Sequence, residues 1–187
     1  MTIHVGQPEQ QRAVPVLLDW RLMLIDTDEV VCFLNGLRVY PSSLRCRATW
    51  LMRPGAGRAV QRAFAGGRPT GPHDAVTAAD IRRGPLLGVR YEDGRAAALD
   101  FFCCYQVTHP EGAGLPVFEL GAGSRAGDGG SAELSLYGLP EQGSIALFWS
   151  WLAVGVPESS LELDGDALRE AASRAVVLWD ASADGDG

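Results

Sequence analysis

The stretch VVCFLNGLRVYPSSLRCRATWLM, residues 30–52, decides the fold class. Its second half, from Leu44 to Met52, alternates apolar and polar side chains with the period of two that is typical of a strand with one face in water. The first half, from Val30 to Tyr40, is rich in β-branched and aromatic residues, which favour strands. The Pro-Ser-Ser turn at 41–43 separates the two halves, and Asn-Gly at 35–36 predicts either a tight turn or a bulge. The stretch therefore predicts an antiparallel meander.

Further strand patterns lie on both sides of this meander. Residues 14–24, VPVLLDWRLML, end in a clear apolar and polar alternation. Apolar runs at 86–91 and 95–105 flank Glu-Asp-Gly at 92–94, and Asp-Gly between two such runs is a strong hairpin signal. These runs add an N-terminal strand and a hairpin to the predicted fold.

The later part of the chain predicts a loop and another hairpin. The segment 121–130, GAGSRAGDGG, is so rich in glycine that it predicts a flexible loop. Apolar runs at 131–139 and 144–152 predict a second hairpin across residues 140–143.

The last predicted element is a helix, which begins at Asp164 or Asp166, since either residue is an acceptable N-cap. Its apolar residues recur at helical spacing; they are Leu168, Ala171, Ala172, Ala175, Leu178 and Trp179. Many strands followed by one late helix predict a mainly β fold, an antiparallel β-sandwich or a partly closed barrel with a C-terminal α-helix.

The chain is predicted to form one domain, because its 187 residues can bury a core without disulfides or metals. We expect a flexible N-terminal arm at 1–13, a single β-rich domain at 14–179 and a disordered acidic tail at 180–187. Residues 53–85 are rich in Gly, Pro, Ala and Arg and lack a strand period, so they predict an irregular, partly helical insertion.

Composition argues against nucleic acid and membranes as partners. The net charge is -7, which disfavours binding to phosphate backbones and anionic lipid. No apolar run approaches the roughly 20 residues of a membrane span, and the first dozen residues lack the apolar core of a secretory signal. The four cysteines have no Cys-x-x-Cys spacing and lie in apolar runs, where thiols behave as small hydrophobes. We therefore expect a cytoplasmic protein with reduced thiols.

The sequence predicts no catalytic residues, no metal ligands and no cofactor. The glycine-rich segment lacks the strand, the helix and the lysine of a phosphate-binding loop. The three histidines are isolated from one another, so a metal site would need long-range convergence. A nucleophile could be drawn from Asp100, Cys104 and His109, but residues five apart in a strand lie about 16 Å from each other. A buried structural thiol is the favoured interpretation of Cys104.

One charge pattern has a binding interpretation. The segment 53–90 holds seven Arg and two Asp, a balance of +5, whereas residues 111–187 hold 13 acidic residues and three Arg, a balance of -10. Guanidinium groups bind carboxylate and phosphate in a fork, so the candidate binding residues are Arg58, Arg62, Arg82 and Arg83. The alternative is a solvated loop, or two segments of one fold that face each other.

Four segments, in this order, carry a resemblance. They are GLRVYPSSLRCRATW (36–50), LLGVRYEDGR (86–95), LYGLPEQGSIALFWSWLAVGVPES (136–159) and LDGDALREAASRAVVLW (163–179). The order is similar to that of an uncharacterised family of actinobacterial proteins of unknown function. The resemblance implies an actinobacterial cytoplasm and a shared fold, and it carries over no activity.

The favoured interpretation of the function is a non-catalytic intracellular interaction module or assembly subunit, with a protein partner or a second copy of the chain. Two alternatives stay open. One is a small-ligand or carbohydrate binder, in which an aromatic side chain such as Trp149 or Trp151 is exposed in a groove. The other is an enzyme whose site converges from distant strands, which would show a concave pocket lined by perturbed acids, cysteine or histidine.

Overall fold

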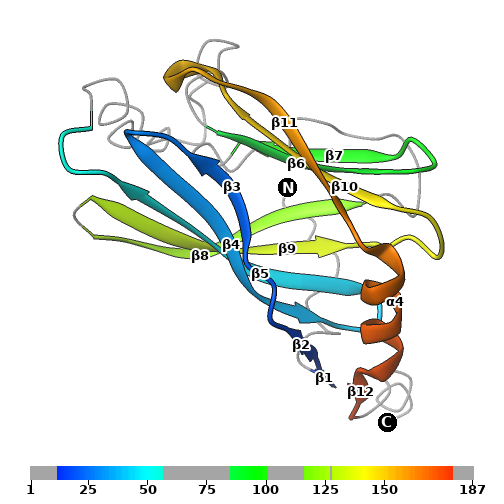
Figure 1. The fold of residues 1–187 in the computed structure, drawn as a ribbon. Coiled ribbons are helices and arrows are strands. Elements are labelled where there is room, and N and C mark those ends of the chain that lie inside the picture. The colour runs from blue at the N-terminus through cyan, green and yellow to red at the C-terminus, as the bar shows by residue number, and fades with distance from the viewer. Residues whose placement is uncertain (1–11, 57–84, 101–115, 127, 179–187) are drawn as a thin grey trace, which may run out of the picture.

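The computed structural model describes residues 12–56, 85–100, 116–126 and 128–178. These residues form a mainly β fold of antiparallel sheets, none of them closed, with a C-terminal helix. The predicted fold class is therefore confirmed as a sandwich (Figure 1). Most of the predicted insertion lies outside the described residues, as do residues 1–11 and 179–187, so the proposed boundaries of arm, domain and tail stay predictions.

The large sheet has the strand order β2-β4-β5-β9-β8, and β3 also pairs with β4. Its strands are β2 (Val16–Leu18), β3 (Leu22–Asp26), β4 (Val30–Val39), β5 (Ser43–Met52), β8 (Val117–Ala126) and β9 (Gly129–Tyr137). The predicted meander is confirmed, because β3, β4 and β5 are neighbours.

The alternation predicted for the second half of the meander is also confirmed. Leu44, Cys46 and Ala48 of β5 are buried, whereas Arg47 between them is exposed. The Asn-Gly pair at 35–36 is a bulge, since the register between β4 and β5 shifts there and Gly36 has a φ of 62°. The bulge keeps Leu37 and Val39 buried beyond it.

The small sheet has the strand order β11-β10-β6-β7. Its strands are β6 (Leu86–Tyr91), β7 (Ala96–Asp100), β10 (Ile145–Trp151) and β11 (Val156–Leu163). The first predicted hairpin is confirmed by the pairing of β6 with β7, and Gly94 in its turn has a φ of 87°.

The second predicted hairpin is wrong. β9 pairs with β5 and β8 in the large sheet, whereas β10 pairs with β6 and β11 in the small sheet. The segment 138–144 carries the chain from one layer of the sandwich to the other. Each strand packs its apolar side chains into the shared core from its own sheet, so the two runs face each other and do not pair.

The predicted loop at 121–130 is also wrong, because β8 runs to Ala126 and β9 begins at Gly129. The glycines here allow close packing. A Cβ on Gly130 would lie 2.6 Å from Cζ2 of Trp50, and a Cβ on Gly123 would lie 2.8 Å from the carbonyl oxygen of Ser131. The segment forms strands because glycine lets a ring and a backbone approach it.

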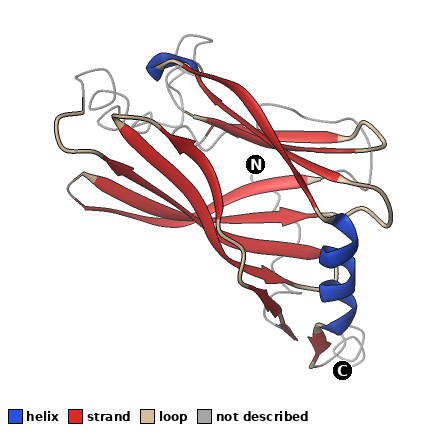
Figure 2. Cartoon of the chain, viewed as in Figure 1, coloured by secondary structure: helices blue, strands red, loops and turns tan. Residues whose placement is uncertain are grey.

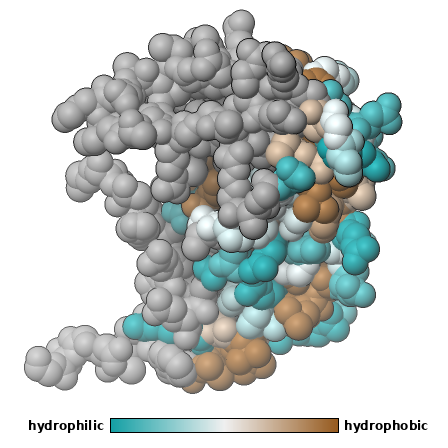
Figure 3. All heavy atoms as spheres, turned by 90° about the vertical axis from the view of Figure 1, so that its left-hand side faces the viewer, coloured by the Kyte–Doolittle hydropathy of each residue, from teal (hydrophilic) through white to brown (hydrophobic). Residues whose placement is uncertain are grey.

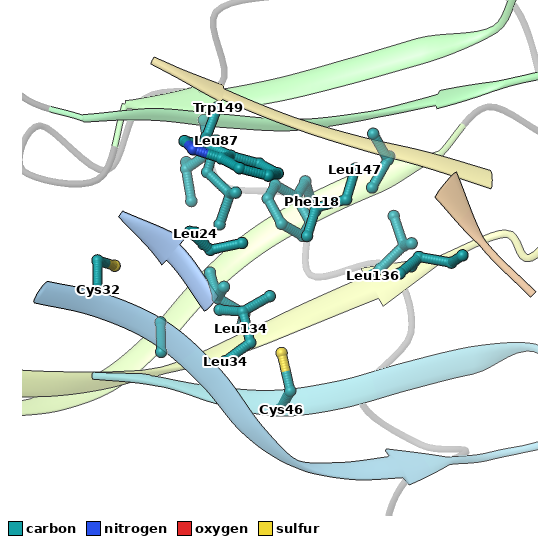
Figure 4. Close-up of a cluster of buried hydrophobic side chains, with 14 of the residues drawn as sticks. Leu24, Cys32, Leu34, Cys46, Leu87, Phe118, Leu134, Leu136, Leu147 and Trp149 are labelled. Carbon is teal, nitrogen blue, oxygen red and sulfur yellow. The ribbon is translucent and has the colours of Figure 1, made fainter. Parts of the chain in front are cut away.

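The core lies between the two sheets (Figure 4). Leu34, Cys46 and Leu134 reach into it from the large sheet, and Leu87 and Trp149 reach into it from the small sheet. All five are buried. This layer supplies the hydrophobic burial on which the fold depends.

The helix α4 (Gly165–Arg174) covers one end of the sandwich, next to β2 and β4 (Figure 2). Asp164 is the N-cap, and its Oδ1 accepts a hydrogen bond from the backbone N–H of Ala167 at 2.9 Å. Leu168 and Ala171 are buried against the core. In the described residues, no helix is long and apolar enough to span a bilayer.

The predicted helix was too long at its C-terminal end. Ala175 is already extended, with a ψ of 134°. Beyond it β12 (Val176–Val177) pairs antiparallel with β1 (Ala13–Val14). Two consecutive β-branched residues favour the strand, so Leu178 does not belong to the apolar stripe of the helix.

Candidate functional site

The four candidate arginines Arg58, Arg62, Arg82 and Arg83 lie outside the described residues, so their binding role stays a prediction. Arg53, just before that segment, has partners. Its Nη2 donates to Oδ1 of Asp26 at 2.5 Å, and its Nε donates to the carbonyl oxygen of Thr27 at 2.8 Å. Arg53 therefore fixes the turn between β3 and β4.

Three connections meet at the α4 end of the small sheet, and we call this region the loop junction. They are the β6–β7 turn, the β9–β10 crossing at 138–144 and the start of α4. Oε2 of Glu92 accepts a hydrogen bond from the N–H of Ser144 at 3.1 Å. Nη1 of Arg169 donates to the carbonyl oxygen of Gly143 at 2.8 Å, and its Nη2 donates to Oδ1 of Asp166 at 2.6 Å. Side chains from two elements thus hold the crossing.

Two shallow depressions lie at the loop junction. One, of about 470 Å³, is lined by Asp93, Arg95 and residues 138–142. The other, of about 770 Å³, is wide open, and its ionisable lining residues are Glu92, Glu141, Glu162, Asp164, Asp166 and Arg169. Its lining is acidic, and Arg169 is engaged by Asp166 and the Gly143 carbonyl.

Asp93 is held as an anion in the β6–β7 turn. Its Oδ1 accepts the backbone N–H of Arg95 at 3.0 Å, and its Oδ2 accepts Nε of the same residue at 2.7 Å. These hydrogen bonds, the backbone one first, lower the pKa of Asp93. A general acid needs a raised pKa, so Asp93 is not suited to that role. Its two hydrogen bonds to Arg95 instead stabilise the turn.

The outer face of the large sheet carries a charged cluster. Glu133 on β9 lies between two arginines, with Arg38 Nη2 at 2.6 Å from its Oε1 and Arg45 Nη1 at 3.6 Å from its Oε2. Arg47 lies directly opposite Glu133 in the β5–β9 register and is exposed. Glu119 lies opposite Ser135 on the same face, so arginines and carboxylates alternate across this part of the sheet.

The end of the sandwich at which β1 pairs with β12 bears exposed aliphatic side chains. They lie on β1, β2 and β12 and in the residue after β12, and we call this region the ribbon. Val14 and Val176 lie directly opposite each other, and the N–H of Leu178 continues the ladder by donating to the carbonyl oxygen of Arg12 at 2.8 Å. The exposed fractions are Val14 50%, Leu17 71%, Val176 56%, Val177 52% and Leu178 52%. Apolar atoms gather at the lower end of the molecule in Figure 3, the level at which β1 and β12 lie in Figure 1.

Among the described residues, the buried ionisable groups do not form a reactive site. Burial raises the pKa of Cys32 and of Cys46 to about 12, so both are protonated thiols at neutral pH. Burial also raises the pKa of Tyr91, whose ring lies 5.4 Å from the Arg95 guanidinium carbon. Cys104 and His109, from the nucleophile considered above, lie outside the described residues.

Two of the tryptophans bear on the carbohydrate-binding alternative. Trp149 and Trp151 are buried in the core, so neither is the exposed aromatic platform that a sugar site needs. Among the described residues, no three His, Cys, Asp or Glu side chains are placed to hold a metal ion. Comparison of the chain with family models, with curated proteins and with solved structures gave no match.

The ribbon was not foreseen in the sequence, although a signal for it exists. Val176 and Val177 are consecutive β-branched residues at the end of a helical pattern. Val14 lies at the start of the apolar run 14–18, which Pro15 interrupts. Neither feature says that the two segments pair, because they lie at opposite ends of the described chain.

Proposed function

We propose that the protein is a non-catalytic interaction module that binds another protein through the ribbon. The observation that carries the proposal is the exposure of Val14 and Val176, which lie directly opposite each other, together with that of Leu17, Val177 and Leu178 on the same three strands and their flank, each at 50% or more. Single exposed hydrophobic residues are ordinary, whereas a group of them on one part of a surface is typical of an interaction site. Covering one half-exposed Val or Leu contributes about 1 kcal/mol to binding.

The surroundings of the ribbon support a docking role. The ladder between β1 and β12 fixes the backbone of Val14 and Val176, so little conformational freedom is lost on binding. The helix α4 lies directly before β12 and is anchored by Leu168. A rigid aliphatic surface of this kind suits the apolar centre of a protein interface.

The two alternative functions have less support in the described residues. An enzyme would place perturbed nucleophiles in a concave site, whereas Cys32 and Cys46 are buried and protonated. A carbohydrate binder would expose an aromatic ring in a groove, whereas Trp149 and Trp151 are in the core. The interaction module is therefore the function that we propose.

The actinobacterial family and the cytoplasmic location are part of the same proposal. The first rests on the order of the four sequence segments described above, and the second on the reduced, buried Cys32 and Cys46. Fractionation of host cells tests the location, because a cytoplasmic protein is recovered in the cytosolic fraction.

The test is a pull-down from the native host with the tagged full chain and two variants. The first variant is Val176→Thr, Val177→Thr and Leu178→Gln, which keeps β-branched residues in the ribbon and makes it polar. The matched control is Met23→Gln with Leu152→Gln, because these side chains are exposed at 48% and 66% on other parts of the surface.

We expect one stoichiometric partner with the wild type and with the control, and a loss of at least tenfold in its recovery with the ribbon variant. Circular dichroism and thermal unfolding check that both variants keep the fold. A partner that the ribbon variant retains in full would overturn the proposal, as would a wild-type bait that recovers none.

A further inference from the structure

Of the two edges that the small sheet has among the described residues, β7 forms one and β11 forms the other. β11 pairs with β10, and no strand formed by the described residues lies on its other side. Figure 1 shows it running along the front of the molecule towards α4. Of its eight residues, Val156 and Leu163 at its ends are buried, whereas those between them are exposed or half-buried. Alternate residues of such a strand direct their N–H and C=O groups into solvent.

The register assigns a face to each side chain of β11. Ser160 lies opposite Phe148 and Glu162 opposite Ala146, so Ser160 and Glu162 share the outer face of the sheet. Glu158 is exposed and lies beside the register shift between Trp149 and Trp151. Leu161 lies opposite Leu147 on the core side and is 37% exposed. The edge thus offers two exposed carboxylates and, on the core side, an aliphatic side chain.

The carboxylates of β11 are available to a partner. Among the ion pairs of the described residues, none involves Glu158 or Glu162. The strand also runs into the loop junction, where Glu141, Asp164 and Asp166 add negative charge. The local field therefore attracts a cationic segment.

The same charges oppose pairing with a second copy of this strand. Two β11 strands that meet antiparallel about Ser160 would place Glu158 of each copy directly opposite Glu162 of the other. Like charges at directly opposite positions destabilise a strand pair. The acidic side chains, and Pro157 near the start of the strand, therefore disfavour pairing of β11 with the β11 strand of a second copy.

We propose that β11 receives an extended cationic segment of another protein as a fifth strand of the small sheet. In antiparallel pairing, the residue opposite Glu162 comes first and is basic, and the next residue, opposite Leu161, is aliphatic. The residue opposite Glu158 follows four positions after the first and is also basic. The recognised pattern is therefore basic, aliphatic, any two residues, basic, with main-chain hydrogen bonds supplying much of the affinity.

The first experiment uses a fluorescein-labelled peptide, GTRVTTRTG, which carries this pattern, and fluorescence anisotropy with the full chain. We expect saturable binding that weakens with added salt. The variant Glu158→Gln with Glu162→Gln is expected to lose at least tenfold in affinity. Its matched control is Glu119→Gln with Asp128→Asn, which makes the same change in net charge on the large sheet and is expected to bind as the wild type does.

The second experiment tests the backbone pairing. An edge strand accepts hydrogen bonds from alternate residues of its partner, so the peptide is N-methylated in two versions, on odd and on even residues. We expect one version to lose binding and the other to retain it. We also expect bound peptide to slow amide hydrogen exchange in residues 158–163.

Each contrary result overturns the inference. Equal binding by both N-methylated peptides would mean attraction by charge alone, and equal binding by GTEVTTETG would mean no charge recognition. Absence of binding, or a self-associated chain in which β11 is already protected, would exclude a cationic partner strand. The inference is separate from the ribbon, because the ribbon variant is expected to bind the peptide unchanged.

Discussion

The strands β5 and β11 have contrasting places in the sandwich. β5 lies in the middle of the large sheet between β4 and β9, and every second side chain from Leu44 to Ala48 is buried. Among the described strands, β11 has one neighbour, and the residues between Val156 and Leu163 are exposed or half-buried. The contrast indicates that the centre of the large sheet supports the fold, whereas the rim of the small sheet is available for binding.

The largest expected effect is at the centre. Leu134 on β9 is fully buried opposite Cys46 of β5, so Leu134→Ala is expected to lower the free energy of unfolding by about 3–4 kcal/mol. Leu161→Ala on β11 removes the same atoms from a rim position and is expected to cost less than about 1 kcal/mol. Urea denaturation of both variants measures the difference, and equal costs would break the contrast between centre and rim.

A pair of glycines gives the next largest effect. Gly130 lies beneath the Trp50 ring at the centre, where an added Cβ would also lie 2.9 Å from the carbonyl oxygen of Ser124. Gly130→Ala is therefore expected to destabilise the protein by about 1–3 kcal/mol. The nearest atom to a Cβ on Gly121 is at 3.4 Å, so Gly121→Ala on the edge strand β8 is the control. Thermal unfolding measures the stability of both variants. A Gly121→Ala variant less stable than Gly130→Ala would contradict the close contact between Gly130 and the Trp50 ring.

A smaller effect is expected where β11 meets α4. Asp164→Ala removes the oxygen that accepts the N–H of Ala167 and is expected to cost about 1 kcal/mol. The Asp164→Ser variant keeps a side-chain oxygen that can cap the helix and is expected to recover most of the loss. Chemical denaturation measures both, and an Asp164→Ser variant no better than Asp164→Ala would argue against capping.

The smallest effect concerns Asp93 in the β6–β7 turn. Because the fold lowers its pKa, its carboxylate contributes stability at neutral pH, and this contribution is lost as the pH falls below about 4 through the folded pKa. Asp93→Asn is therefore expected to reduce the melting temperature slightly at pH 7, and this difference from the wild type is expected to shrink as the pH falls. If the difference in melting temperature grew as the pH fell, the fold would raise the pKa of Asp93 and would not lower it.

Sequence reasoning succeeded where local pattern and tertiary burial agree. The alternation in β5 and the Asp-Gly turn after β6 are local properties, and both were predicted. The pairing of β9 was not, because its partner β5 lies far away in the sequence and the strand that follows it belongs to the other sheet. Strand partners are decided by non-local packing, which a local pattern does not contain.

The rim of the molecule was harder to predict than its centre. β11 was missed because Pro157 and the polar run at 158–160 weaken the strand pattern. The ribbon was missed because Val176 and Val177 continue the helical spacing of α4. Binding surfaces are less constrained by burial than cores, so their sequences carry a weaker structural signal.

The pairing of β1 with β12 also governs the order in which the molecule is assembled. Val14 is made early by the ribosome, and its partner Val176 is made only after both sheets and α4 have been synthesised. The pair therefore cannot form until both sheets and α4 have been synthesised. A partner that recognises the paired ribbon would therefore bind only chains in which both sheets and α4 have been synthesised, and would not bind shorter nascent chains.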